Sequence, residues 1–187
     1  GASNSSNANL SVLTTTAGSL TPTFASGTTS YAATVGILTT SVTITPTVAD
    51  ATATIQVRIN NGSYTTVASS TASSALSLNI GSNTIDVQVT AEDGITNKIY
   101  TITVTRTPLV TWTGQTSSAW STASNWNPAN VPTSTDSAFI PSGTPNTPNN
   151  AGTITLASLT VASGVTVTNS GTINVTEALT NGGTITG

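Results

Sequence analysis

The chain has 187 residues, of which only 5% are charged, and its formal net charge is −3. Ordinary globular proteins carry about 25% charged residues, and a chain with three Lys or Arg has no basic patch with which to bind nucleic acid. Cys, Met and His are all absent, which excludes disulfide bridges, thiolate metal ligands and histidine bases. No apolar stretch is long enough to cross a bilayer as a helix, so we expect no membrane insertion.

Apolar and polar residues alternate with period two through the first half of the chain, which predicts strands with one wet face and one buried face. The predicted strand segments are 10–15, 31–35, 41–45, 55–59, 63–68, 75–80, 85–90 and 100–105. Seven or eight short strands at this spacing predict an antiparallel, immunoglobulin-like β-sandwich. We expect Val87, Val89, Ile102 and Val104 to point into its core from neighbouring strands.

The same half of the chain carries a family resemblance. It begins with NANLSVLTTTAGSLTPTFASGTTSYAATVG, continues through SVTITPTVADATATI, and ends with VTAEDG followed by YTITVTR. These segments resemble the bacterial cadherin-like β-sandwich domains, which recur in large secreted and surface proteins. The resemblance implies a spacer or adhesion module and no catalyst. The stretch 105–113, where the domain would join the next one, holds no acidic residue, so calcium sites do not follow and no metal or cofactor is expected.

Four segments are predicted along the chain. Residues 1–8 form an N-terminal segment, either flexible or donated as a strand, and residues 9–107 form the sandwich. Residues 108–111 form a short linker stiffened by Pro108. Residues 112–187 form a second β-domain that contains all three Trp residues.

The second domain opens with a recognisable pattern of Trp, Asn and Pro. Trp112-Thr-Gly114 is followed by Trp120, then by Asn125-Trp-Asn-Pro128, and then by two further Pro-containing turns. The pattern resembles the opening segment of bacterial surface proteins and autotransporter or adhesin passengers, where it precedes β-solenoid coils. The resemblance implies a structural role and does not identify a ligand.

From Thr153 onward, short apolar-alternating runs are interrupted by Ser-Gly, Asn-Ser-Gly and Asn-Gly-Gly turns. This predicts the first coils of a β-solenoid or a small sandwich. The expected inner face comprises Ile154, Leu156, Leu159, Val161, Val165, Val167, Ile173, Val175, Leu179 and Ile185. The stretch 172–187 has almost no charge, and a strand edge of this kind templates further pairing. We therefore expect an assembly edge at Thr172, Ile173, Val175, Leu179 and Ile185, covered by another copy or by a neighbouring module of a longer chain. The covering strand could be donated from residues 1–8 or 10–15, head to tail, which would give a filament.

Two ligand sites compete with this structural interpretation. Exposed Trp112, Trp120 and Trp126 could stack on sugar rings and make a carbohydrate-binding module for a surface glycan, but buried Trp residues that cap the first coil are the favoured interpretation. The repeated units Thr153-Ile-Thr155, Thr166-Val-Thr168 and Thr184-Ile-Thr186 could order water on a flat face and bind ice, but ordinary strand surface is the simpler interpretation.

Catalysis is not expected. The six carboxylates are scattered, apart from the adjacent Glu92 and Asp93 in a turn, and glycosidase chemistry needs two carboxyl groups about 5 to 10 Å apart. Lys98 could form a crosslink to an Asn beside a buried acid, although a lysine that protects a strand edge is the simpler role. The sequence thus predicts an all-β, non-catalytic structural subunit or segment of a bacterial extracellular fibre or surface adhesin.

Overall fold

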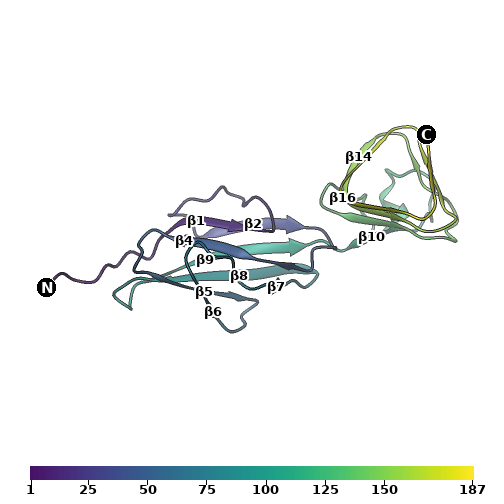
Figure 1. Cartoon of the computed structure of the whole chain (residues 1–187). Helices are drawn as coiled ribbons and strands as arrows, with labels where there is room; N and C mark the ends of the chain where they lie inside the picture. The colour runs from purple at the N-terminus through teal and green to yellow at the C-terminus, as the bar shows by residue number, and fades with distance from the viewer. The chain divides into compact units, whose positions relative to one another are not determined.

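The structure is a computed structural model that describes all residues 1–187. The chain is almost entirely β, as the sequence predicts, and its only helical segment is one 3₁₀ turn, η1 (Ala123–Asn125). It forms two compact units (Figure 1). The first comprises Gly1–Val35 and Thr39–Arg106, and the second comprises Gly36–Leu38 and Thr107–Gly187. No helix is long and apolar enough to cross a membrane.

The first unit is a sandwich of two layers. Its strands are β1 (Leu10–Thr15), β2 (Ser30–Val35), β3 (Ser41–Val42), β4 (Ile44–Val48), β5 (Thr54–Ile59), β6 (Thr65–Val67), β7 (Leu76–Ser77), β8 (Gly81–Thr90) and β9 (Asn97–Arg106). One layer is a five-stranded sheet in the order β2-β9-β8-β5-β6, and the other consists of the pairs β1-β4 and β3-β7. The core lies between them.

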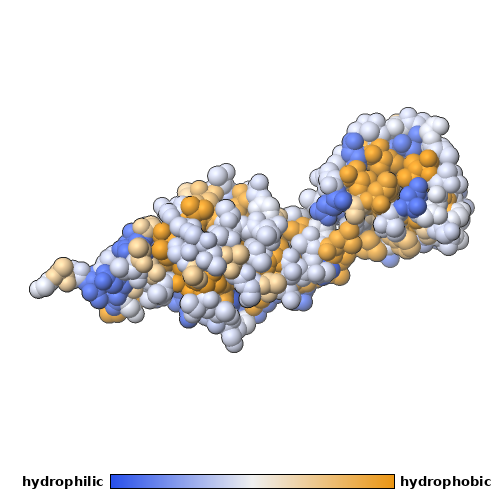
Figure 2. Space-filling model, in the orientation of Figure 1, coloured by the Kyte–Doolittle hydropathy of each residue, from blue (hydrophilic) through white to orange (hydrophobic).

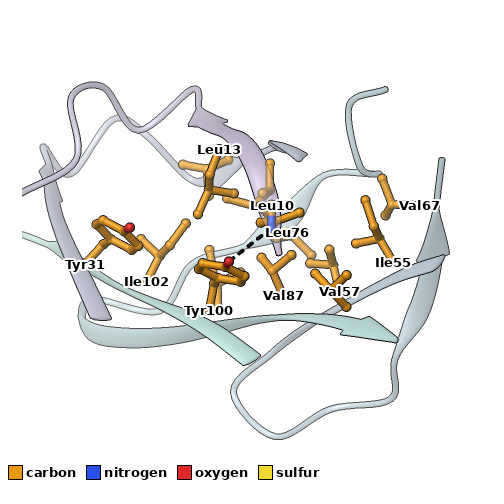
Figure 3. Close-up of a cluster of buried hydrophobic side chains, with 14 of the residues drawn as sticks. Leu10, Leu13, Tyr31, Ile55, Val57, Val67, Leu76, Val87, Tyr100 and Ile102 are labelled. Carbon is orange, nitrogen blue, oxygen red and sulfur yellow. Dashed lines mark hydrogen bonds between the residues drawn. The ribbon is translucent and has the colours of Figure 1, made fainter. Parts of the chain in front are cut away.

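Period-two alternation explains most of this core, because alternate residues of a regular strand point to the same face. Val87, Val89, Ile102 and Val104 are all fully buried on the paired strands β8 and β9, which confirms that they point into the core from neighbouring strands. Figure 3 shows aliphatic and aromatic side chains from both layers in contact. The Tyr100 hydroxyl joins the layers: it accepts a hydrogen bond from the backbone N–H of Leu10 (3.0 Å) and donates one to the carbonyl of Ser26 (2.7 Å).

Three expectations for this unit are corrected. The predicted strand 41–45 is divided, since β3 pairs with β7 while β4 pairs with β1. The segments 63–68 and 75–80 contain only the short strands β6 and β7. The main sheet is not purely antiparallel, because β2 and β9 pair in parallel from Ser30 with Thr101 to Val35 with Arg106. Alternation marks which face is buried and carries no information on strand direction.

The N-terminal residues contact their own sandwich in this structure, and their donation as a strand to another copy stays a prediction. The backbone N–H of Ser5 donates to the Glu92 carboxylate (2.8 Å), and the Ser5 carbonyl accepts from the N–H of Asp93 (3.1 Å). Ala8 is buried in the core, and β1 pairs with β4. Donation of β1 to another molecule would therefore remove Leu10 and Leu13 from this core.

The second unit is a stack of parallel strands that wind into coils. They are β10 (Leu109–Trp112), β11 (Trp126–Asn127), β12 (Ser137–Ile140), β13 (Asn149–Asn150), β14 (Thr153–Val161), β15 (Thr166–Asn169), β16 (Thr172–Asn181) and β17 (Thr184–Thr186). One sheet has the order β11-β10-β12-β14-β16, and the other has the order β13-β15-β17. All these pairs are parallel except β10-β11. In Figure 1 the coils of this unit are seen end on as a roughly triangular ring.

Residues 108–111 do not form the expected linker. Leu109–Trp112 is strand β10, and it pairs in parallel with β12 from Leu109 with Ser137 to Thr111 with Phe139. Pro108 does follow the end of strand β9, but no linker follows Pro108. The alternating Leu-Val-Thr-Trp that follows is already part of the second core, where Val110 and Trp112 are buried.

Candidate functional site

The three Trp residues form one buried cluster at the start of the stack. Trp112 ends β10, Trp126 begins β11, and Trp120 lies in the loop between them; they are 0%, 2% and 2% exposed. The ring centroids of Trp120 and Trp126 lie 4.7 Å apart and those of Trp112 and Trp126 lie 5.0 Å apart, both edge to face. The indole N–H of Trp112 donates to the carbonyl of Asn146 (2.7 Å), and that of Trp126 donates to the carbonyl of Trp120 (2.9 Å).

This burial agrees with the cap that the sequence favours and contradicts the alternative, an exposed glycan platform. A platform needs open indole faces, and these faces pack against each other and against the first strands of the stack. The antiparallel strand β11 adds to the same end of the sheet, where it pairs with β10. The cluster therefore closes the first coil, as a cap of a solenoid must do to keep apolar surface from water.

A buried amide that sequence reasoning missed holds the loop before β11. Asn125 is 0% exposed. Its Oδ1 accepts from the backbone N–H groups of Thr116 and Ser117, both at 2.9 Å, and its Nδ2 donates to the carbonyl of Ala119 (2.9 Å). The signal was present in the sequence, because an Asn that directly precedes a buried Trp in a turn-rich segment is well suited to this bonding.

Coils of the stack repeat at a nearly constant spacing. Thr153 pairs with Thr172 and Leu156 with Val175, both 19 residues apart, and Leu159 pairs with Leu179 after a bulge that adds one residue to β16. In the other sheet, Val167 pairs with Ile185, 18 residues further along the chain. Apolar residues therefore stand above apolar residues, which is the solenoid-like arrangement that the sequence predicts.

Asn-x-Gly turns stack at a corner of the coils. Asn150 is 2% exposed, and its Nδ2 donates to Asn169 Oδ1 (2.8 Å) in the next coil and to the carbonyl of Gly152 (2.9 Å). The coils approach so closely here that a Cβ at Gly171 would collide with the carbonyl of Gly152. The repeated N-x-G at 150 and 169 was the sequence signal for this side-chain ladder.

The last strands carry the predicted assembly edge. β16 and β17 lie at the edges of their sheets, and neither pairs with a further strand. Val175 and Ile185 are half-buried, whereas Leu156 and Val167 beneath them in the preceding coil are 0% exposed, and Ile173 is half-buried like Ile154 beneath it. Figure 2 shows apolar residues gathered on the face of the second unit that carries the C-terminus, with polar residues around them.

Two assignments on this edge need revision. Leu179 is 54% exposed, so it does not share an enclosed inner face, although Leu159 directly beneath it is 0% exposed. Thr172 is exposed and pairs with the exposed Thr153, which places it on the outer side of the coil. The edge is therefore made of backbone groups together with the partly covered apolar side chains of β16 and β17.

The three Thr-x-Thr units do not form one array. Thr166 and Thr168 stack on Thr184 and Thr186 in register, and all four are exposed. The third unit, at 153–155, lies in the other sheet, where it pairs with Thr172 and Asn174. A water-ordering face would therefore have two coils of Thr, and ice binding stays a prediction.

The charged groups do not converge on a reactive site. No group of three or more His, Cys, Asp or Glu residues comes together. Asp86 pairs with Arg58 at 2.8 Å. The carboxylate of Asp93 accepts from the Thr96 hydroxyl (2.6 Å) and from the N–H groups of Thr96 and Ile95, and these bonds hold its pKa below the usual range. Its role is to fix the turn between β8 and β9.

Lys98 does meet an asparagine, but no carboxylate completes the group. Its Nζ donates to Asn9 Oδ1 (2.9 Å) and to the carbonyl of Ser26 (2.8 Å), and it lies 5.3 Å from the centre of the Tyr100 ring. A Lys–Asn crosslink needs an acid to shuttle protons. The observed bonds instead fasten the residue before β1 to β9.

The geometry of the first unit defines an all-β sandwich with a single core and no assembled reactive groups. A model of the cadherin-like beta sandwich domain family matches residues 7–107. Because this match covers more than half of the chain, the chain belongs to the cadherin-like β-sandwich family. No curated protein matches the chain. The resemblance of residues 112–187 to autotransporter and adhesin passengers stays a prediction.

Proposed function

We propose that this chain is a non-catalytic structural subunit or segment of a bacterial extracellular fibre or surface adhesin, which assembles edge to edge through β16 and β17. The observation that carries the proposal is the parallel register of the second unit. Each coil presents to the next the same ladder of backbone groups and the same column of apolar side chains. The edge of β16 and β17 offers this surface again.

The partner that fits this edge is another β-strand, either from a neighbouring module or from a second copy of the chain. The side chains that it would cover are Ile173, Val175, Leu179 and Ile185. Glu177 is the only charged residue of β16 and β17, so little electrostatic repulsion opposes an incoming strand.

A role outside the cell is supported by composition and by family. Cadherin-like domains are usually extracellular or exposed at the surface. The chain has no thiol or thioether to oxidise and has only three Lys or Arg at which trypsin could cut. Cadherin-like domains are also generally non-catalytic, and the separate environments of the carboxylates support a structural role here.

The test measures assembly of the 187-residue chain by light scattering and electron microscopy over a range of concentrations. We expect oligomers or filaments that grow with concentration, because an edge of this length templates pairing. The double variant Ile173→Lys, Ile185→Lys places charge among the apolar side chains and should stay monomeric. The matched control, Thr166→Lys with Thr168→Lys, adds the same charge to the outer face of β15 and should still assemble.

The contrary result is a wild-type chain that stays monomeric at high concentration while the amides of β16 and β17 are protected from hydrogen exchange. Protection without a partner would show that the edge is stable by itself, and the proposed assembly surface would then be wrong.

A further inference from the structure

A cavity of about 410 Å³ opens in the second unit beside the first half of β14. It exists because the coil before β14 is incomplete. β12 pairs with β14 only from Ser158 to Val161, so no strand covers that edge of β14 between Thr153 and Leu156. The loop that carries Trp120 passes nearby and leaves a space of the size that small ligands occupy.

The rim of the cavity has unused hydrogen-bonding capacity. Ser118, Ser121, Asn149 and Thr153 all line it and are exposed, and none of their side chains makes a hydrogen bond within the chain. By contrast, Asn150 also lines the cavity, but its amide is already bonded in the Asn-x-Gly ladder. Three hydroxyls and one amide can each donate and accept.

The floor of the cavity is apolar. Val131 and Ile154 are half-buried, and Trp120 also lines the cavity although it is only 2% exposed. The Trp120 N–H has no hydrogen-bond partner, whereas the other two indole N–H groups are bonded. No Asp, Glu, Lys or Arg lines the cavity. The lining therefore combines an apolar floor with an uncharged polar rim.

We propose that this cavity binds a neutral saccharide unit. A pyranose ring has an apolar face that fits the floor, and its hydroxyls both donate and accept, as the free side chains of the rim require. A carboxylated or sulfated sugar would find no cation here. An extended peptide could pair with the open edge of β14, but this edge is only four residues long and would leave the unbonded hydroxyls of the rim without a role.

The cavity and the assembly edge are separate. The cavity lies on the edge of β14 opposite to β16, so a ligand there does not compete with a strand added to β16. This inference also differs from the exposed Trp platform, since the Trp cluster stays buried and the ligand is held by the polar side chains of the rim. A failure of saccharide binding would leave the assembly proposal intact, and the reverse also holds.

The experiment is saturation-transfer NMR on the 187-residue chain with three neutral probes, mannotriose, lactose and N,N′-diacetylchitobiose, and with N-acetylneuraminic acid as the charged comparison. We expect at least one neutral probe to bind with millimolar affinity, as a few hydrogen bonds on an open site allow, and the charged sugar not to bind. The double variant Asn149→Ala, Thr153→Val should weaken binding about tenfold, because it removes two hydrogen-bonding groups from the rim.

The matched control is Asn174→Ala with Thr166→Val, which removes the same two groups from exposed positions outside the cavity and should bind as the wild type does. Absence of binding by all three neutral probes would overturn the proposal. So would equal affinity of the Asn149→Ala, Thr153→Val variant and the wild type, or binding of only an extended peptide, since that would assign the cavity to strand addition.

Discussion

The sandwich and the coil stack bury apolar residues in different ways. In the sandwich, two layers face each other, and a side chain such as Val87 is enclosed by strands that are distant in the sequence. In the stack, a side chain is enclosed by the coil above and the coil below. Leu159 is 0% exposed in β14, while Leu179 at the matching position of β16 is 54% exposed.

This difference teaches that burial in the stack is a property of position along the coil axis. The two Leu residues have the same type, column and strand direction, and only the number of adjacent coils differs. A sandwich of this kind is complete by itself, whereas a stack gains stability with every coil that is added. The contribution of the residues at its edge to the stability of the stack therefore depends on whether another coil or strand covers them.

The chain provides separate optical probes of the two units. All three Tyr residues lie in the sandwich and all three Trp residues lie in the stack. Trp fluorescence therefore follows unfolding of the second unit, and Tyr fluorescence or calorimetry follows the first. Substitutions in each unit therefore test this difference in burial.

The largest effect is expected for Val87→Asp. The change buries an unpaired carboxylate in the sandwich core and should lower the free energy of unfolding of the first unit by more than about 4 kcal/mol. Gln56→Asp, on the exposed face of the neighbouring strand β5, should change it by less than about 1 kcal/mol. Chemical denaturation followed by Tyr fluorescence is the measurement, and equal effects of the two variants would show that the register is wrong.

Within the stack, Leu159 and Leu179 test how much the cost of a substitution depends on enclosure by adjacent coils. Leu159→Ala should destabilise the second unit by about 2–5 kcal/mol, because it opens a cavity in a packed column. Leu179→Ala removes a half-exposed side chain and should cost under about 1 kcal/mol. Trp fluorescence during denaturation measures both at a concentration at which the chain is monomeric. A similar cost for both changes would mean that another group encloses Leu179.

The join between the two layers of the sandwich is tested by Tyr100→Phe. Loss of the hydroxyl leaves the buried N–H of Leu10 without an acceptor, which should cost about 1–3 kcal/mol. The matched control is Tyr64→Phe, because the Tyr64 hydroxyl makes no hydrogen bond and its ring lies under Arg58. Calorimetry should show a lower Tm for Tyr100→Phe and almost no change in Tm for Tyr64→Phe. An unchanged Tm for Tyr100→Phe would contradict the role given to this hydroxyl.

The smallest effect concerns the pH dependence of Asp93. The bonds from Thr96 and Ile95 lower the pKa of this carboxyl in the folded state below its ordinary value. The stabilisation is therefore present above the unfolded pKa and is lost as the pH falls through the lower folded pKa. Asp93→Asn should have a lower Tm than the wild type near neutral pH, and the difference should narrow at strongly acidic pH. A constant difference would show that ionisation of Asp93 is not involved.

The sequence predicts the buried faces of strands well and their pairing poorly. Alternation at Val87 and Ile102 fixes which side chains enter the core, since it depends only on the two-residue repeat of a strand. The parallel pairing of β2 with β9 is not readable from the same pattern, because an alternating strand looks the same in either direction. The strand at Leu109–Trp112 was missed for a different reason: the proline before it suggested a linker.

The candidate site shows the same division. The inner positions of β14 and β15 follow from alternation, whereas the assembly role of the residues in β16 and β17 stays a prediction. The sequence left open an exposed Trp platform beside the favoured buried cap, because residue type does not show whether an indole faces water or another indole, and the structure has the buried cap. The cavity beside Thr153 could not be predicted, since it exists because no strand pairs with the first half of β14 on that side. Which strands lie beside each other cannot be read from the sequence.

The parallel pairing of β2 with β9 has a mechanical consequence. The chain enters the sandwich ahead of β1 and leaves it after β9, so tension applied to the two ends pulls β9 along its own axis. The strand must then slide against both neighbours, and the six register pairs with β2 and the ten with β8 bear the load together. Bonds that are sheared together resist more force than bonds that open one at a time, as in the peeling of a hairpin. Under tension, the sandwich would thus act as a clamp.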